Sequence, residues 1–298
     1  MPKKEKIQQM FDSIAPGYDA FNHLTSLGAD RCWRRRALRE VVGPRVLDEA
    51  CGTGDFAIAI ARHLADLNRK RPKTEQVPGF RGGPIQKKAE NCSGRRISWG
   101  TCTENGQKLN RSQVFEGDLF KKRPKTEQVP AISVTGVDIS KGMLEVMRRK
   151  VAEAGLDDIG CSSVSGETGD CCALGYPDAS FDTVTVAFGV RNFEDREKAL
   201  HEVLRVLRHG GRFVMLELGI PRNPVVRAAY KFYFTRIMPA VGAGISKDKA
   251  AYRYLPASVL DFPKPEDWMA TMQKTGFAQV RHRSLSLGIC NLFTGVRE

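Results

Sequence analysis

The sequence lacks any apolar run that approaches the roughly 20 residues a helix needs to span a bilayer. Its opening residues, Met1-Pro-Lys-Lys-Glu-Lys6, are charged and no apolar segment follows them, which argues against a secretory signal. The eight cysteines include no CxxC pair, so a zinc ribbon and a dithiol redox motif are disfavoured. These absences predict a globular protein of the reducing cytoplasm.

Acidic residues are scarce relative to basic ones, and the formal net charge is +13. The excess is local, because residues 69–131 contain 15 Lys and Arg but only 6 Asp and Glu. A protein that docks on nucleic acid spreads its basic residues over one face and adds aromatic residues for stacking. We therefore predict no nucleic-acid partner.

Residues 66–131 also lack the apolar periodicity of helices and strands. The nine residues Lys70-Arg-Pro-Lys-Thr-Glu-Gln-Val-Pro78 recur unchanged at 122–130, but they have no apolar face that would let repeats stack as a solenoid. We interpret residues 66–131 as a basic, low-order insertion into an otherwise single domain, residues 1–298. A contact loop for nucleic acid or an acidic membrane is the less favoured alternative.

The stretch Arg45-Val-Leu-Asp-Glu-Ala-Cys-Gly-Thr-Gly-Asp55 has the pattern of a strand followed by a ligand-binding turn. Gly52 and Gly54 allow the backbone to turn sharply and to approach a ligand closely. Ala57 stands where the dinucleotide fingerprint needs its third glycine. Two glycines and a carboxylate suit a ligand with an amino acid and a ribose but no pyrophosphate, such as S-adenosylmethionine. Asp48 would order this loop or meet the ligand's ammonium group, and an ordinary strand-to-helix turn is the alternative.

The rest of the sequence alternates helix and strand patterns. Helices are predicted at 6–23, 30–41, 55–67, 141–154, 194–207 and 266–275. The first of these is broken at 15–17, and Gly210-Gly211 is the predicted stop signal of the helix at 194–207. Strands are predicted near 45–49, 133–137, 161–166, 181–187, 212–217, 277–284 and 288–296. This order predicts an α/β fold with a doubly wound, mostly parallel sheet and an antiparallel edge strand. We place a helical cap in residues 1–41 and a lid segment in residues 221–258.

Carboxylates follow successive predicted strands, and in a doubly wound sheet the ligand binds across the carboxyl ends of the strands. Asp138 ends the second strand, where a carboxylate can accept hydrogen bonds from both ribose hydroxyls. Asp170 follows the third strand, where its side chain suits an adenine amino group and Cys171 offers a backbone donor. Each Asp alone is more often a cap or turn residue, but their recurrence predicts one cofactor site.

Three motifs are specific enough to suggest a family. They are Met10-Phe-Asp-Ser-Ile-Ala-Pro-Gly-Tyr-Asp19 with Asn22, Ser26-Leu-Gly28 and Trp33-Arg34 after it, Phe188-Gly-Val-Arg-Asn-Phe193, and Tyr252-Arg-Tyr-Leu-Pro-Ala-Ser-Val259 followed by Phe262-Pro263. These motifs resemble the signatures of the menaquinone and ubiquinone biosynthesis C-methyltransferases of the UbiE/MenG type. The resemblance covers nearly everything outside residues 66–131. It implies a class I methyltransferase, Rossmann-like, with S-adenosylmethionine as cofactor.

The resemblance also implies site residues. The family's cofactor contacts fall on Thr53, Asp138, Asp170 and Cys171, with Ala187 also lining the site. Together with the glycine loop, the predicted cofactor-binding set is Asp48, Gly52, Thr53, Gly54, Asp138, Asp170, Cys171 and Ala187. The sequence departs from the family pattern at Glu49, a charge inside a strand, at Cys172, where an acidic residue is usual, and in the insertion.

The implied reaction is C-methylation of a polyprenylated quinol, and demethylmenaquinol is the favoured acceptor over the benzoquinol precursor of ubiquinone. A nucleic-acid methyltransferase and an inactive homologue damaged by the insertion are the alternatives. The ring carbon becomes nucleophilic when a neighbouring hydroxyl ionises, so the site needs a base or a cation for the quinolate. Arg191 is the predicted cation, with a loop salt bridge to Glu194 or Asp195 as its structural alternative. The predicted catalytic residues are Arg191, Asp248 and Tyr252, and the predicted substrate-binding residues are Tyr18, Asn192 and Tyr254.

Residues 221–245 offer an apolar surface for the prenyl tail. The polar residues Arg227, Lys231 and Thr235 fall four apart, which leaves a broad aromatic face on a helix. This helix would cap the site, take up the tail or lie at a membrane interface with its basic stripe toward the headgroups. A lid packed on the core or a dimer contact is the alternative. The predicted partners are the quinol, the inner face of a membrane through a peripheral contact, and a second copy in a homodimer.

Overall fold

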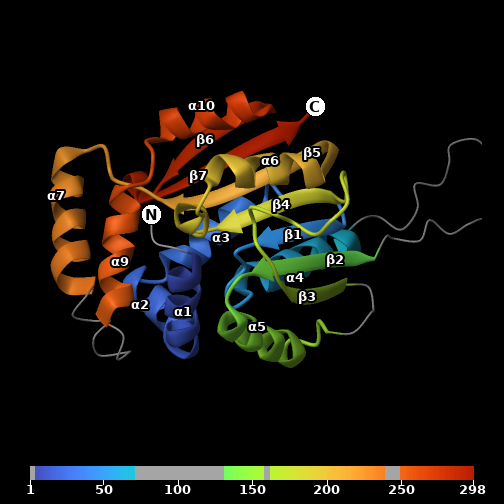
Figure 1. Cartoon of the computed structure of the whole chain (residues 1–298), viewed down its shortest axis with the longest axis horizontal. Helices are drawn as coiled ribbons and strands as arrows, with labels where there is room; N and C mark the ends of the chain where they lie inside the picture. Colours follow the sequence, from blue (N-terminus) through green and yellow to red (C-terminus); the bar gives the residue numbers. More distant parts are fainter. Residues whose placement is uncertain (1–3, 71–130, 158–161, 239–248) are drawn as a thin grey trace, which may run out of the picture. The chain divides into compact units, whose positions relative to one another are not determined.

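The computed structural model describes residues 4–70, 131–157, 162–238 and 249–298 (Figure 1). The chain divides into a compact unit of residues 1–69 and 130–298 and a second unit of residues 70–129. The predicted low-order insertion at 66–131 lies almost wholly outside the described residues, so its lack of order stays a prediction.

A seven-stranded sheet forms the centre of the first unit, with the strand order β3-β2-β1-β4-β5-β7-β6 (Figure 1). The strands are β1 Arg45–Glu49, β2 Ile132–Asp138, β3 Ser162–Thr168, β4 Phe181–Ala187, β5 Leu207–Leu218, β6 Phe277–Leu285 and β7 Cys290–Arg297. Neighbours among β1 to β5 are parallel, whereas β7 runs antiparallel to both β5 and β6. The predicted doubly wound, mostly parallel sheet with an antiparallel edge is confirmed, and β7 lies one position inside the edge strand β6.

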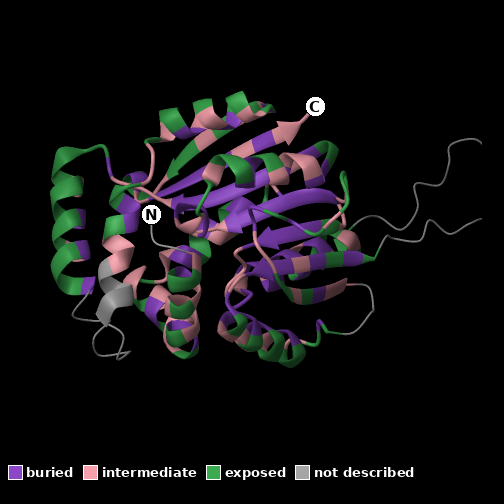
Figure 2. Ribbon diagram, viewed as in Figure 1, coloured by how far each residue is buried: buried purple, intermediate pink, exposed green. Residues whose placement is uncertain are grey.

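Helices pack on both faces of this sheet. They are α1 Lys4–Ile14, α2 Tyr18–Thr25, α3 Ala29–Leu38, α4 Asp55–Lys70, α5 Lys141–Glu153, α6 Arg196–Val206, α7 Pro224–Phe232, α9 Lys249–Leu260 and α10 Pro265–Thr275, with short turns η1 Ala15–Gly17, η4 Val190–Asn192, η5 Tyr233–Ile237 and η6 Ser286–Gly288. Side chains alternate across each strand, so Val46 and Leu216 join the core under α3, α4 and α5, while Leu47 and Met215 join the core under α6 and α10. Figure 2 shows the central strands buried between these layers.

Capping side chains explain where two helices begin. Ser140 Oγ accepts a hydrogen bond from the Met143 N–H at 3.1 Å at the start of α5. Asp195 caps α6 by accepting from the Lys198 N–H at 2.9 Å, so this helix begins two residues after its predicted start.

The prediction that Gly210-Gly211 stops α6 is wrong. The helix ends at Val206, and both glycines lie within β5, where Gly210 has a φ of +74°.

Glu49 is a charged residue type inside the buried strand β1. Its side chain is fully buried, and neither carboxyl oxygen has a hydrogen-bond partner among the described residues. Burial, assisted by Asp48 and Glu202, raises the pKa of Glu49 well above its usual value. Folding therefore favours the protonated form of this carboxyl group.

Because the folded state keeps a proton that the unfolded chain releases above about pH 4.3, Glu49 destabilises the fold increasingly as the pH rises from that value. We expect the uncharged isostere Glu49→Gln to match the wild type at pH 4 and to be more stable at pH 8, by on the order of 1 kcal/mol or more. Denaturant unfolding at the two pH values measures this difference. A stability gain of the same size at both pH values would contradict the protonated state of Glu49.

Candidate functional site

The glycine loop after β1 has the close backbone approach that its sequence predicts. Gly52 and Gly54 have φ angles of +55° and +80°, which glycine adopts without strain. A Cβ at Gly54 would lie 2.5 Å from Cγ of Met147 on α5, so a larger residue does not fit there. Because α4 begins directly afterwards at Asp55, backbone N–H groups gather at this turn, and such groups suit an anionic ligand group.

Asp138, at the end of β2, connects this loop to the next helix. Its carboxylate accepts hydrogen bonds from the N–H of Gly52 at 2.9 Å and from the N–H of Ser140 at 2.8 Å. Burial raises the pKa of Asp138 above its usual value, although these two hydrogen bonds oppose the shift. A carboxylate has about four lone-pair sites, so two hydrogen bonds leave room for ligand hydroxyls.

A cavity of about 80 Å³ lies beside this carboxylate. Five of the eight predicted cofactor residues line it: Gly52, Asp138, Asp170, Cys171 and Ala187. Lys4, Ile7 and Phe11 of α1 line it as well. Typical ligand sites have volumes of roughly 300–1,000 Å³, so α1 lies against a cavity that has to widen before it can hold a nucleoside.

Asp170, which follows β3, is bound to α1. One carboxylate oxygen accepts a hydrogen bond from Lys4 Nζ at 2.6 Å, and the other accepts from the Cys172 N–H at 2.8 Å. Burial acts to raise the pKa of Asp170, but these two hydrogen bonds outweigh it and the pKa lies below its usual value. Asp170 is therefore ionised at neutral pH, and its ion pair with Lys4 holds α1 at the cavity.

The remaining predicted cofactor residues, Asp48, Thr53 and Gly54, do not line this cavity. Asp48 is 1% exposed and accepts a hydrogen bond from Thr185 Oγ1 at 2.5 Å, and burial raises its pKa to about 7. Thr53 Oγ1 donates to Asp19 at 2.5 Å, which attaches α2 to the loop. The structure thus places Asp48 inside the fold, where it can order the loop but has no surface toward the cavity.

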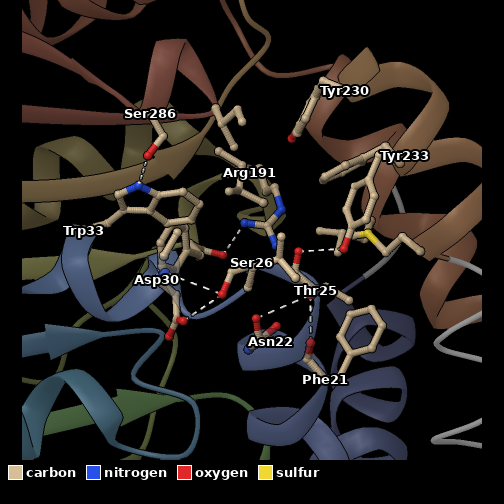
Figure 3. A pocket seen from close by; sticks show the side chains of 18 of the residues that line it. Phe21, Asn22, Thr25, Ser26, Asp30, Trp33, Arg191, Tyr230, Tyr233 and Ser286 are labelled. Carbon is tan, nitrogen blue, oxygen red and sulfur yellow. Dashed lines mark hydrogen bonds between the residues drawn. The ribbon is translucent and has the colours of Figure 1, made fainter. Parts of the chain in front are cut away.

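A larger cavity of about 400 Å³ adjoins the first one (Figure 3). Phe11, Tyr18, Phe188 and Asn192 line both cavities and therefore form the boundary between them. Beyond this boundary, the walls come mainly from α2, α3, α7, η5 and α9, and the apolar ones include Phe21, Trp33, Tyr230, Phe234 and Met238. The volume and the apolar walls suit a drug-sized apolar ligand.

Arg191 lies in the wall of the larger cavity and is 7% exposed. Its Nη1 donates to Glu217 Oε1 at 2.7 Å and also to the Phe188 carbonyl oxygen, and its backbone N–H donates to Glu217 Oε2 at 3.1 Å. Burial acts to lower the pKa of Arg191, but Glu217 and Tyr18 outweigh it and the pKa is raised. The salt bridge exists, but its partner is Glu217 and not the predicted Glu194 or Asp195.

Glu217 is a site residue that the sequence did not reveal. It ends an apolar run in β5 and is fully buried, and its Oε1 also accepts from the Leu218 N–H at 2.9 Å. The one signal in the sequence is a carboxylate at the end of a strand of apolar residues. Its partner became identifiable only through the pairing of β5 with β4.

The predicted substrate residues meet at the boundary of the two cavities. Tyr254 on α9 donates its hydroxyl proton to Asn192 Oδ1 at 3.1 Å. Burial raises the pKa of Tyr18, although the charge of Arg191 opposes the shift, so Tyr18 is protonated at neutral pH. Asp248 and the side chain of Tyr252 lie outside the described residues, and their catalytic roles stay predictions.

Polar side chains at the end of α2 and on α3 also line the larger cavity and were not predicted as part of the site. They are Ser26, Asp30, Trp33 and Arg34. Asp30 is 3% exposed and accepts a hydrogen bond from Ser26 Oγ at 2.7 Å (Figure 3). It also forms an ion pair with Arg34. Trp33 Nε1 donates to Ser286 Oγ at 2.8 Å, which ties α3 to the turn between β6 and β7. The only signal for this cluster was that Ser26, Trp33 and Arg34 belong to the N-terminal motif.

In the part of the chain that the structure describes, no group of three or more His, Cys, Asp and Glu side chains is arranged to hold a metal ion. None of the helices in that part combines the length and the apolar character needed to cross a membrane. The two adjoining cavities, which share four lining residues, form the candidate site.

Comparisons with known proteins agree with this geometry. The model of the ubiE/COQ5 methyltransferase family matches residues 1–297. The chain is 36% identical over 296 residues to the "Ubiquinone/menaquinone biosynthesis C-methyltransferase UbiE" of Geobacter sulfurreducens, which covers 98% of this chain and 89% of that protein. It is 34% identical over 298 residues to the "Demethylmenaquinone methyltransferase" of Bacteroides fragilis, covering 99% and 94%.

A solved structure supports the fold. The putative S-adenosyl-L-methionine-dependent methyltransferase of Methanococcus maripaludis has a TM-score of 0.55 with 13% identity, covering 100% of this chain and 95% of that one. At that identity the likeness concerns the class I methyltransferase fold alone, whereas the family match and the curated relatives extend along nearly the whole sequence. This chain therefore belongs to the ubiE/COQ5 methyltransferase family.

Proposed function

We propose that this protein transfers the methyl group of S-adenosylmethionine to a ring carbon of a polyprenylated quinol, with demethylmenaquinol as the favoured acceptor. The observation that carries the proposal is the contact between two unlike cavities, one lined by Asp138 and Asp170 and the other by aromatic side chains. Relatives named for menaquinone or ubiquinone biosynthesis support this acceptor class. The benzoquinol precursor of ubiquinone is the second candidate, because several relatives carry both names.

We assign nucleoside recognition to the residues of the smaller cavity. Asp138 keeps lone pairs for ribose hydroxyls, and Asp170 suits the adenine amino group once Lys4 releases it. The backbone N–H groups of the first turn of α4 are assigned to the amino-acid part of the ligand, because the Gly52 N–H is already donated to Asp138. When bound, the cofactor supplies an electrophilic methyl group. Because Lys4 and Phe11 line the cavity, binding has to displace the side chains of α1.

Arg191 is assigned to the charge that develops on the acceptor. Ionisation of a ring hydroxyl makes the neighbouring carbon nucleophilic, and Arg191 stays cationic at any physiological pH. In a buried site a fixed cation stabilises such an anion more strongly than water does. Tyr18 and Asn192 lie at the same boundary and are the assigned hydrogen-bond partners of the hydroxyl. Asp248 and Tyr252 stay predictions for proton acceptance.

The prenyl tail is assigned to the far part of the larger cavity. Tyr230, Phe234 and Met238 are buried there at intervals of four residues along α7 and η5. The polar residues Arg227, Lys231 and Thr235 are exposed, in keeping with a polar stripe on the outer side. A peripheral contact with the cytoplasmic face of a membrane accords with such a substrate. The homodimer remains a prediction without an observation for or against it.

Incubation of the purified full chain with labelled S-adenosylmethionine and each of the two quinols, followed by mass analysis, tests the acceptor. We expect a methylated product from demethylmenaquinol, because the aromatic cavity suits a fused ring with an apolar tail. If the protein binds the cofactor in calorimetry yet methylates neither quinol, the proposed acceptor is wrong. If it binds no cofactor at all, the inactive-homologue alternative holds instead.

Two substitutions separate cofactor binding from chemistry. Asp138→Ala should weaken cofactor binding by about 10- to 100-fold, because hydrogen bonds to a charged acceptor contribute roughly 1.5–3 kcal/mol. Arg191→Ala should lower kcat by about 10²–10³-fold and leave the cofactor dissociation constant nearly unchanged. Calorimetry and single-turnover kinetics measure the two effects. An equal loss of cofactor affinity in both variants would overturn these roles.

Glu217 is assigned as the positioning residue of Arg191. Glu217→Gln should lower kcat by about tenfold through looser positioning. It should also move the acid limb of the pH–rate profile to lower pH, because the quinolate then faces a cation that no carboxylate neutralises.

A matched control separates this role from a loss of folding. Replacing the whole pair, as in Arg191→Met with Glu217→Met, leaves no unpaired buried charge and should retain a near wild-type Tm. This double variant should nevertheless be inactive. A Glu217→Gln variant with an unchanged kcat and pH profile would show that the carboxylate is only structural.

A further inference from the structure

The three most exposed large apolar side chains of the described residues lie on three separate segments. Leu27 is 85% exposed in the turn between α2 and α3, Val225 is 76% exposed in the first turn of α7, and Leu287 is 73% exposed in η6. We call these three side chains the apolar rim. Most large apolar residues of the core are less than 9% exposed, so three such side chains in water need an explanation.

The segments of the apolar rim meet around the larger cavity. Leu27 itself lines the cavity, and so do Val226 and Ser286, the sequence neighbours of the other two rim residues. Tyr233 in η5 donates its hydroxyl proton to the Thr25 carbonyl at 2.8 Å, and Trp33 binds Ser286 (Figure 3). These contacts join all three segments around one opening.

A further contact closes this ring of segments. A Cβ on Gly288 of η6 would lie 3.3 Å from Cα of Pro221, so η6 packs against the residues that lead into α7. The apolar rim is therefore a local surface beside the cavity and not three unrelated positions.

Stability of the fold does not account for the rim. Leu27 and Leu287 have φ angles of +51° and +60°, in the left-handed region that is strained for a leucine and suits glycine or asparagine. An exposed side chain in such a conformation gains almost no packing energy to offset the strain. The presence of leucine at both turns therefore indicates a surface that acts outside the folded chain.

The surroundings of the rim are basic. Residues 221–238 contain four Lys and Arg and no Asp or Glu, and the basic side chains at 222, 227, 231 and 236 are all exposed. Arg31, four residues after Leu27, is exposed as well. Arg222 has an acidic partner in Glu266. Apolar side chains bordered by cations are typical of a surface that binds an anionic bilayer.

We propose that the apolar rim docks this protein on an anionic lipid surface, so that a membrane-dissolved ligand enters the larger cavity through the opening beside Leu27. This inference rests on the proposed function for its ligand, a quinol with a prenyl tail. A cavity of about 400 Å³ takes the ring and only part of a long tail. The rest of the tail has to leave by the opening, and apolar surface left in water is unfavourable. An opening that faces lipid removes this penalty.

The test uses the full chain and vesicles of phosphatidylcholine with phosphatidylglycerol, separated from free protein by sedimentation. The variant is Val225→Ser with Leu287→Asn, because neither residue lines a cavity and asparagine tolerates the left-handed backbone. We expect its vesicle partition coefficient to fall by about 10- to 100-fold, the order expected for loss of two inserted apolar side chains. Its Tm should equal or exceed that of the wild type, which excludes unfolding as the cause.

The matched control is Leu67→Asn on α4, a leucine that is 46% exposed and lines neither cavity. It should bind vesicles like the wild type. Vesicles of phosphatidylcholine alone, or high salt, should weaken binding of the wild type, because the basic side chains then lose their anionic partners. Equal partition of the rim variant and the wild type would overturn the proposal.

Activity assays separate the two proposals. The rim variant should methylate a tail-less quinol in solution at the wild-type rate and lose turnover of a long-tailed quinol held in vesicles. If the wild type methylates no quinol, the proposed function fails, whereas vesicle binding still reports on the rim. If the rim substitutions convert a dimer to a monomer in light scattering and leave vesicle binding intact, the rim is an interface between copies, and the lipid proposal is wrong.

Discussion

The buried ion pair between Arg191 and Glu217 joins β5 to the loop after β4, and Phe188 and Asn192 of this loop line both cavities. Two charges that are almost fully removed from water are tolerated only as a pair, since either alone would carry a large desolvation penalty. Arg191 also holds the loop after β4 through its hydrogen bond to the Phe188 carbonyl oxygen, and Phe188 has a φ of +66°. The next residue, Gly189, packs closely on Ala50, because a Cβ on Gly189 would lie 2.5 Å from the Cβ of Ala50. This loop supplies part of the boundary between the smaller cavity, which Asp138 and Asp170 line, and the larger cavity with its aromatic walls.

Hydrogen bonds and ion pairs of acidic and basic side chains hold α1 and α2 across the carboxyl ends of the strands. Asp12 accepts from the Ser140 hydroxyl and the Gly142 N–H at the start of α5, and Asp19 pairs with Lys150 at 2.8 Å. With the Lys4 to Asp170 pair, these contacts hold α1 and α2 over the site. Because these side chains are only partly buried, the contacts are modest in strength. Such contacts suit helices that have to yield when a ligand enters.

The two buried acidic residues of β1, Asp48 and Glu49, affect the fold differently. Asp48 accepts a hydrogen bond from Thr185, which fixes the end of β1 from which the glycine loop leaves. Glu49, the next residue, points to the other side of the strand and has no partner among the described residues. Nothing in the structure explains Glu49. Its desolvation is a cost to the fold that no contact at the site offsets.

The sequence by itself determined the order of strands and helices, the position of the glycine loop after β1 and the positions of Asp138 and Asp170 at the end of β2 and just after β3. Apolar periodicity, glycine and the limits of a strand are local properties of the chain. Only the tertiary structure decided that Arg191 pairs with Glu217, that Asp48 faces inward and that α1 lies against the smaller cavity. These outcomes depend on which strands become neighbours, and β4 lies between β1 and β5 although long segments separate them in the sequence. Local patterns carry no information about such distant pairings.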